Sequence, residues 1–369
     1  MSLEETSQNT ALAKKHNFGA GPSILPPKVL EEASKAVNEL NGTGLSLIEI
    51  SHRSKEFKEI MQEAQTLVRE LLDVPDNYSV QFLQGGASLG FYMAAMNFMK
   101  KENGKAGYVK TGSWAKKAIK EAKKVGEVVE VASSEDKNFN YIPKNFGIPN
   151  DLDFMHFTSN NTIFGTEFHN IPTSRSDLIC DMSSDIFSRP VDVSKYTLIY
   201  AGAQKNMGPA GTTLHIVNKD KLGNTERDIP SMLDYQVHDE KDSMFNTPPV
   251  FAVYTSMLML RWIKENGGVE GMQKRNAEKA EIMYNEIDNN PMFTGVAEKD
   301  DRSYMNATFV LKDESHKEEF ENMLEEAGIK GLNGHRSVGG YRASMYNALP
   351  KESVEALVDV MKEFANKKA

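Results

Sequence analysis

Two residues near the middle of the chain, Lys205 and Asp181, have the types and spacing needed for amine chemistry. Asp181 follows the apolar run Leu178–Cys180, and Lys205 follows the apolar run Leu198–Ala201, within Ala-Gly-Ala-Gln-Lys. Both runs predict buried strands, so both side chains are expected at strand ends. A lysine with a lowered pKa forms Schiff bases, and a neighbouring aspartate suits the pyridine nitrogen of pyridoxal phosphate (PLP). The alternative interpretation is a solvated turn lysine and a helix-capping aspartate.

A glycine turn between a predicted strand at Ser79–Leu83 and a predicted helix at Ser88–Lys101 is a candidate phosphate site. The turn reads Gln-Gly-Gly-Ala, and free N–H groups at a helix start attract anions. It nearly matches G-x-G-x-x-G, with Ala87 in the place of the second glycine. A dinucleotide site also needs an acidic residue about 20 positions later, but the next strand ends in Lys110-Thr111. The turn therefore predicts a phosphate rather than a dinucleotide.

Two further candidates lie at the ends of other predicted strands. Trp114 follows the strand Ala106–Lys110 at the start of a helix, where its flat ring could stack on a cofactor. Thr162 follows the strand Phe154–Thr158 and brings a hydroxyl to the same edge of the sheet. Ordinary core packing is the alternative role for Trp114.

Five cationic side chains stand out in this acidic chain. His52 and Arg53 come just before a predicted helix, and helix N-termini favour anions. His335 and Arg336 lie on a glycine-rich loop, and Arg342 lies on the strand after it. Solvated surface positions are the alternative for both groups.

The predicted elements alternate between strands and helices over most of the chain. This pattern indicates an α/β fold with a mostly parallel sheet, helices on both faces, and ligands at the carboxyl ends of the strands. The best candidate domain boundary is Asn289-Asn290-Pro291. We expect a flexible leader at 1–16, a large domain at 17–290 whose first residues are candidates to join the smaller domain, and a small α+β domain at 291–369.

The composition excludes several classes of protein. A net charge of −9 over 369 residues and a pI of about 5.5 argue against binding to nucleic acid or to anionic membranes. Cys180 is the only cysteine, so we expect no intrachain disulfide, no metal site and a cytoplasmic location. The longest apolar stretch, 250–263, falls short of the roughly 18 residues of a membrane helix. The first sixteen residues lack the apolar core of a signal peptide.

Several short motifs carry a specific resemblance over the chain from about Phe18 to its end. They are SHRSKEF, QGGAS, GSWA, AGAQKN-GPAG, SMFNTPP and GHRSVGGYRAS. In this order they closely resemble the phosphoserine aminotransferase family, which belongs to the class V aminotransferases of PLP fold type I. The resemblance implies a large domain with a seven-stranded, mostly parallel sheet, a small α+β domain at the C-terminus, and PLP as the cofactor.

The same resemblance implies a role for each matching residue. Lys205 is implied to bind the cofactor covalently, and Asp181 to bind its pyridine nitrogen. Trp114 is implied to stack on the ring, and Thr162 to bond at its hydroxyl side. The implied contacts of the cofactor phosphate are the Ala87 and Ser88 N–H groups, the Gln204 side chain, and Asn246 and Thr247 of the partner subunit. Some relatives have Gly-Arg in place of Ala87-Ser88, a change that matters little where the contacts are backbone N–H groups.

The implied substrates are small anionic amino acids and 2-oxo acids, bound in sites shared between the subunits of a homodimer. Arg342 resembles the arginine that binds the α-carboxylate. The implied pocket for the second anionic group is made of His52 and Arg53 with His335 and Arg336 across the dimer interface. The implied reaction interconverts 3-phosphohydroxypyruvate plus L-glutamate and O-phospho-L-serine plus 2-oxoglutarate by a ping-pong mechanism, as in serine biosynthesis and, for some relatives, pyridoxine biosynthesis.

Two alternatives are left open by the residues. The first is another class V aminotransferase acting on alanine or serine with glyoxylate, although neutral substrates do not need four His and Arg side chains. The second is a nucleotide-binding protein without PLP, although no G-x-x-x-x-G-K-[ST] motif is present and Lys205 would then have no role. A cysteine desulfurase would need a catalytic cysteine on a loop, whereas Cys180 lies in a predicted strand.

Overall fold

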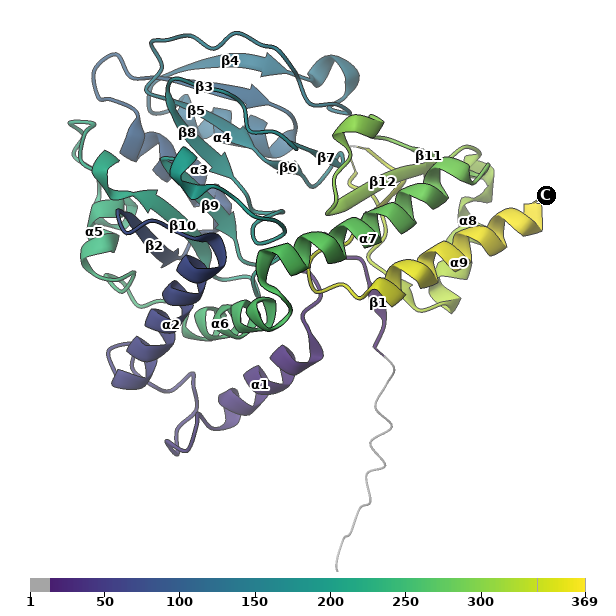
Figure 1. Ribbon diagram of the computed structural model, residues 1–369, viewed down its shortest axis with the longest axis horizontal. Coiled ribbons are helices and arrows are strands. Elements are labelled where there is room, and N and C mark those ends of the chain that lie inside the picture. The colour runs from purple at the N-terminus through teal and green to yellow at the C-terminus, as the bar shows by residue number, and fades with distance from the viewer. Residues whose placement is uncertain (1–13, 337, 369) are drawn as a thin grey trace, which may run out of the picture.

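The computed structural model describes residues 14–336 and 338–368 (Figure 1). Most of the leader predicted at 1–16 lies outside the described residues. Of its last residues, His16 begins the short strand β1 (His16–Asn17), which pairs in parallel with β13 (Ile329–Lys330). The start of the described chain is thus tied to an element near its end.

A seven-stranded sheet forms the centre of the larger part of the molecule (Figure 1). All neighbouring strands are parallel except β10, which is antiparallel to both of its neighbours. The prediction of an α/β fold with a mostly parallel sheet is confirmed. In spatial order the strands are β2 (Tyr78–Leu83), β10 (Thr213–Asn218), β9 (Leu198–Gly202), β8 (Asp177–Asp181), β5 (Phe154–Thr158), β3 (Lys105–Lys110) and β4 (Glu127–Ser133).

Both faces of this sheet are covered, which explains why its central strands are apolar on both sides. In β9, Ile199 and Ala201 join the core under α2 (Lys55–Leu72) and α6 (Val250–Glu265), whereas Leu198 and Tyr200 join the core under α3 and α4. Such alternation is the normal consequence of strand geometry. The helices α3 (Gly86–Phe98) and α4 (Ser113–Ala122) therefore lie on the opposite face from α2 and α6.

The helix starts follow local signals in the sequence. Pro27 opens α1 (Pro27–Asn38), and the Ser54 hydroxyl caps α2 by accepting the Phe57 N–H at 3.3 Å. The helix predicted from Ser88 begins two residues earlier, at Gly86, because Gly85 adopts φ +97° at the N-cap. Ala87 and Ser88 consequently lie in the first turn of α3.

A second, three-stranded antiparallel sheet lies on the right of Figure 1, with order β11 (Phe293–Gly295), β12 (Asn306–Leu311) and β14 (Tyr341–Ser344). Helix α7 packs against α9, β11 and β12. The domain boundary at residue 290 stays a prediction. The remaining helices are α5 (Tyr235–Glu240), α7 (Gly268–Asn289), α8 (Lys317–Glu326) and α9 (Lys351–Lys368).

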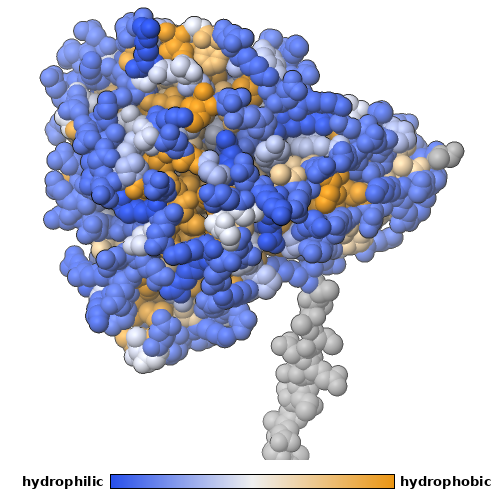
Figure 2. Space-filling model, in the orientation of Figure 1, coloured by the Kyte–Doolittle hydropathy of each residue, from blue (hydrophilic) through white to orange (hydrophobic). Residues whose placement is uncertain are grey.

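One hairpin was not expected from the sequence. The strands β6 (Asn160–Asn161) and β7 (Thr166–Glu167) pair just after β5, at the edge of the large sheet that faces the small one. Hydrophilic residues predominate on the face drawn in Figure 2, and apolar residues form narrow patches between them. Among the helices of residues 14–336 and 338–368, none is long and apolar enough to cross a membrane.

Candidate active site

Lys205 lies in the tight turn that joins β9 to β10, and its side chain is buried. Its Nζ donates to the Thr162 Oγ1 at 2.6 Å. The N-terminal loop packs on this turn: the Ser23 Oγ donates to the Lys205 carbonyl, and a Cβ on Gly21 would lie 3.5 Å from the Lys205 Cγ. Burial, with a smaller contribution from the positive charge of Arg342, lowers the pKa of Lys205 to about 8. The predicted turn thus holds an amine whose neutral fraction near physiological pH is far larger than that of an ordinary lysine.

Asp181 ends β8, beside the strand that leads into Lys205. It is in register with Tyr200 of β9, so both functional side chains belong to the carboxyl edge of the sheet. The Ser183 N–H and hydroxyl both donate to its Oδ1, at 2.9 and 2.6 Å, which leaves Oδ2 without a donor among residues 14–336 and 338–368. Burial raises the pKa of Asp181. A buried carboxylate with one free oxygen is suited to a protonated ring nitrogen.

The turn before α3 forms a cradle of backbone N–H groups. Gly85 caps the helix, and the first helical hydrogen bond runs from the Leu89 N–H to the Gly85 carbonyl at 3.3 Å. The N–H groups of residues 86–88 have no acceptor in the described part of the chain, as expected for a helix start. Ala87 is half-buried and Ser88 is exposed. These free donors and the helix dipole suit a phosphate.

The Gln204 side chain lies beside the turn of Lys205, folded over the backbone of β9. A Cβ on Gly202 would lie 2.6 Å from the Gln204 Oε1, so this approach requires a glycine. On the other side of the cradle, the Gln84 Nε2 donates to the Thr247 carbonyl at 2.5 Å. Asn246 and Thr247 are themselves exposed in the loop before α6. Within one chain, the structure brings this loop to the edge of the cradle.

Trp114 lies in the first turn of α4 and faces Lys205. The Lys205 Nζ is 5.8 Å from the centre of the indole ring. The Trp114 Nε1 is buried and has no hydrogen-bond partner in the described structure. Lys205, Trp114 and Thr162 therefore surround one position at the carboxyl edge of the large sheet.

Arg342 joins the small sheet to this position. It lies in β14, its Nη1 donates to the Thr162 carbonyl at 3.3 Å, and its Nε is buried without a partner among the described residues. Burial lowers its pKa. A guanidinium held with unpaired donors is suited to a carboxylate, which it can bind in bidentate fashion.

The other four cationic candidates fall into two groups. His335 and Arg336 are exposed on the loop before β14, and burial together with the positive charges of Arg342, Lys117 and Arg336 lowers the pKa of His335. His52 is half-buried and Arg53 exposed in the loop before α2. No hydrogen bond or ion pair within residues 14–336 and 338–368 links this second pair to the other predicted site residues.

Several residues of the site were missed by sequence reasoning. The Tyr346 hydroxyl donates to the Ala20 carbonyl at 2.8 Å, and burial raises its pKa to about 12. Asn206 receives the Asn347 N–H at 3.0 Å and ties the lysine turn to the end of β14. Asp185 is buried, which raises its pKa, and its carboxylate makes a small opposing contribution that raises the pKa of Lys205. Tyr346 shares the alternation of Arg342 and Ser344 in the sequence, a signal that could have identified it.

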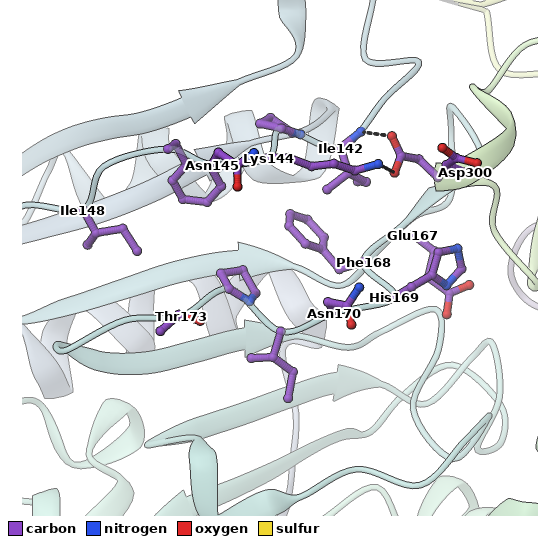
Figure 3. Close-up of a pocket in the computed structure, with 15 residues that line it drawn as sticks. Ile142, Lys144, Asn145, Ile148, Glu167, Phe168, His169, Asn170, Thr173 and Asp300 are labelled. Carbon is purple, nitrogen blue, oxygen red and sulfur yellow. Dashed lines mark hydrogen bonds and ion pairs between the residues drawn. The ribbon is translucent and has the colours of Figure 1, made fainter.

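A separate cavity of about 390 Å³ lies away from these residues (Figure 3). Its charged side chains gather near Asp300, where Lys144 pairs with Asp301 at 3.0 Å, and aliphatic side chains line the other end. None of the predicted site residues lines it. The residues predicted from the sequence therefore do not surround this cavity.

The residues at the carboxyl edge fit PLP. Free N–H groups suit its phosphate, a buried carboxylate with one free oxygen suits its ring nitrogen, an indole face suits its ring, and an amine with a lowered pKa suits its aldehyde. The same edge offers Arg342 for a carboxylate.

Comparison with known proteins agrees with this chemistry. Residues 15–357 match the family model described as aminotransferase class-V. The phosphoserine aminotransferase of Flavobacterium psychrophilum is 58% identical over 355 residues, which cover 96% of this chain and 99% of the relative.

Solved structures of phosphoserine aminotransferases also match this chain. A phosphoserine aminotransferase from Bacillus circulans subsp. alkalophilus matches with a TM-score of 0.93 and 45% identity, covering 96% of this chain and 99% of the other. A PLP-bound phosphoserine aminotransferase from Trichomonas vaginalis matches with a TM-score of 0.90 and 37% identity, covering 95% and 100%. The chain thus belongs to the class V aminotransferases, within the phosphoserine aminotransferase family, and is a PLP-dependent transaminase.

Proposed function

We propose that the chain interconverts 3-phosphohydroxypyruvate plus L-glutamate and O-phospho-L-serine plus 2-oxoglutarate, a transamination of serine biosynthesis. The observation that carries the proposal is the arrangement of Lys205 and Arg342 on either side of Thr162, one bonded to its hydroxyl and the other to its carbonyl. An amine with a lowered pKa next to a guanidinium that has a buried, unpaired Nε suits α-amino acids, which have an amino group and a carboxylate on one carbon. The names of the relatives support the phosphorylated substrate.

Each residue near the cradle has a proposed role in holding PLP. We assign the cofactor phosphate to the Ala87 and Ser88 N–H groups and to the Gln204 side chain. Trp114 stacks on the ring, and Thr162 bonds at the ring hydroxyl. Asp181 bonds the pyridine nitrogen through Oδ2, and Lys205 is the residue of covalent attachment.

The chain's own residues would then carry out the proton transfers. When bound, PLP supplies an aldehyde and an electron-accepting ring. As a free amine, Lys205 would take up the proton from the substrate's α-carbon. Asp181 keeps the ring nitrogen protonated, and the low dielectric around it strengthens this ion pair. Arg342 orients the substrate by its α-carboxylate, so that the α-proton faces Lys205.

The second anionic group of either substrate requires further cations. We assign it to His335 and Arg336 on the loop before β14, with His52 and Arg53 of the partner subunit. A mixed His and Arg pocket accepts a phosphate or a carboxylate, as two substrates that alternate in one site require. The same pair of anionic groups occurs in the phosphorylated 4-hydroxythreonine of pyridoxine biosynthesis, which we propose as a second substrate.

A homodimer is the proposed assembly, because the chain exposes apolar side chains beside Asn246 and Thr247. Helices α1 and α6 pack together, and large apolar residues on and near them are exposed. Covering this surface with a second copy would remove it from water and would bring Asn246 and Thr247 to the partner's cofactor phosphate. The exposed residues are Leu30 (46%), Leu45 (51%), Ile48 (63%), Phe245 (44%) and Phe251 (39%). Light scattering that gives the mass of one chain would refute the dimer.

The location of the protein is also a proposal. We place it in the cytoplasm, because the single cysteine and the acidic surface charge are ordinary for a protein of a reducing compartment. Fractionation of cells that express the chain would test this location.

Turnover of defined substrate pairs tests the function. Purified protein with added PLP is given O-phospho-L-serine and 2-oxoglutarate, and the formation of L-glutamate is measured. A parallel reaction contains L-alanine and glyoxylate. Rapid formation of glutamate with little turnover of the alanine pair supports the proposal. Faster turnover of alanine with glyoxylate would favour the alternative aminotransferase.

A further inference from the structure

Lys117 lies at the mouth of the candidate site, one helical turn after Trp114 in α4. Its Nζ lies 4.2 Å from the centre of the Trp114 ring, a cation–π distance. Residues three positions apart lie on the same side of a helix, which explains the contact. The Lys205 Nζ lies 5.8 Å from the centre of the same ring, so Lys117 and Lys205 share Trp114 as a neighbour.

The charge of Lys117 is not neutralised by a carboxylate among the described residues, unlike the charges of Lys110 and Lys116. Lys116, the preceding residue, pairs with Glu135 at 2.7 Å. Lys110 pairs with Glu130 at 2.6 Å and with Glu135 at 2.7 Å. Within residues 14–336 and 338–368, Lys117 has no ion pair. The N–H donors of Lys117 that point away from the indole are therefore available to a ligand.

Lys117 acts electrostatically on the same loop that carries the proposed anion pocket. Apart from burial, the influences that lower the pKa of His335 are the positive charges of Arg342, Lys117 and Arg336. Val338, on the same loop, packs against the same small apolar cluster as Trp114. The positive charges of Lys117, Arg336 and Arg342 thus all act on His335, in a chain whose net charge is −9. Such a concentration of positive charge is stabilised by an anion of high charge.

We propose that Lys117 binds the phosphate of the phosphorylated substrate and selects it over the side-chain carboxylate of glutamate. The inference rests on the proposed function and deepens it. A phosphate monoester carries about −1.5 to −2 charges at pH 7, whereas a carboxylate carries one. An additional cation therefore stabilises the bound phosphate more than the bound carboxylate, although both occupy the same pocket.

The test compares Lys117→Met with the matched control Lys116→Met in the holoenzyme. Methionine keeps the apolar stem and can contact the indole, so the substitution removes the charge and the N–H donors with little change in packing. We expect Lys117→Met to raise the KM for O-phospho-L-serine about fivefold, the strong end for an exposed charge pair, and to leave the KM for L-glutamate within about twofold. The Ki of inorganic phosphate as a competitor should rise by a similar factor. Lys116→Met should resemble the wild type, and Lys117→Arg should restore the KM.

Several outcomes separate this inference from the proposed function. An active wild type with an unchanged Lys117→Met variant would overturn the role of Lys117 alone. Equal increases in KM for both substrates would also overturn it, since they would indicate a general effect through Trp114. A wild type that does not convert O-phospho-L-serine would refute the proposed function, and the inference with it. The absorbance of bound PLP in each variant measures whether cofactor binding has changed.

Discussion

The lowered pKa of Lys205 leads to a quantitative prediction for the cofactor-free protein. With a pKa of about 8, about 9% of the Lys205 amines are neutral at pH 7, against about 0.04% for an ordinary lysine. The neutral amine is the reactive form, so the neutral fraction of Lys205 at pH 7 should be roughly 200-fold that of an ordinary lysine, and its reactivity should be raised accordingly. Its reactivity should rise with pH and level off above about 8.

Two substitutions should move this pKa in opposite directions. Arg342→Gln removes a positive neighbour and should raise the pKa of Lys205, whereas Asp181→Asn removes a negative neighbour and should lower it further. The assay is competitive acetylation of the cofactor-free protein at a series of pH values. The peptide that contains Lys205 is quantified by mass spectrometry, with free Nα-acetyl-lysine as the reference amine.

Two results would refute this reasoning. The first is a midpoint for Lys205 near that of the reference amine, about 10.4. The second is a pKa of Lys205 that shifts in the same direction in Arg342→Gln and in Asp181→Asn. Stability gives an independent check on the sign: between pH 8 and 10.5 the folded chain holds fewer protons on Lys205 than the unfolded chain. The contribution of this group to the free energy of unfolding should therefore increase with pH across that window, by up to roughly 3 kcal/mol.

The remaining predictions concern single site residues. Lys205→Ala should abolish turnover and leave the circular dichroism spectrum unchanged, and wild-type turnover in this variant would refute the assignment. Arg342→Ala should raise the KM for O-phospho-L-serine and for L-glutamate by about tenfold or more, because the lost contact is to the α-carboxylate that both substrates share. A raised KM for only one of them would assign Arg342 to the pocket for the second anionic group instead. Arg336→Ala should reduce kcat/KM more for O-phospho-L-serine than for a substrate without a phosphate, and equal reductions would argue against a phosphate role.

Much of the large sheet could be predicted because its strands are short apolar runs bounded by turns. β8 and β9 were found from Leu178–Cys180 and Leu198–Ala201, and Lys205 and Asp181 were placed at strand ends by the same pattern. The reversed direction of β10 does not follow from an apolar run, since such a run has no direction of its own. The hairpin of β6 and β7 is polar and only two residues wide, so it has no hydrophobic period to detect.

The candidate site was predicted less completely than the fold. Motifs placed Thr162 and Arg342 as separate candidates, whereas the contact between the Arg342 Nη1 and the Thr162 carbonyl joins two sheets and lies beyond local sequence reasoning. Asn206 was missed because a buried amide between elements has no periodic signal. Lys117 was missed because a lysine on an amphipathic helix is ordinarily a solvated residue, and its position over Trp114 and the ion pair of Lys116 with Glu135, which separate the two lysines, appear only in the structure.

The most direct test of the proposed function is a half-reaction followed by absorbance. Holoenzyme is mixed with O-phospho-L-serine without any 2-oxo acid, and the band of bound PLP above 400 nm is recorded; L-alanine is added to a second sample as the control. The proposed roles of Lys205, Arg342 and the cationic pocket predict that O-phospho-L-serine converts this band to that of the aminated cofactor near 330 nm, and that L-alanine leaves it unchanged. Equal conversion by both amino acids would contradict the anion pocket, and no conversion by O-phospho-L-serine would contradict the proposed reaction.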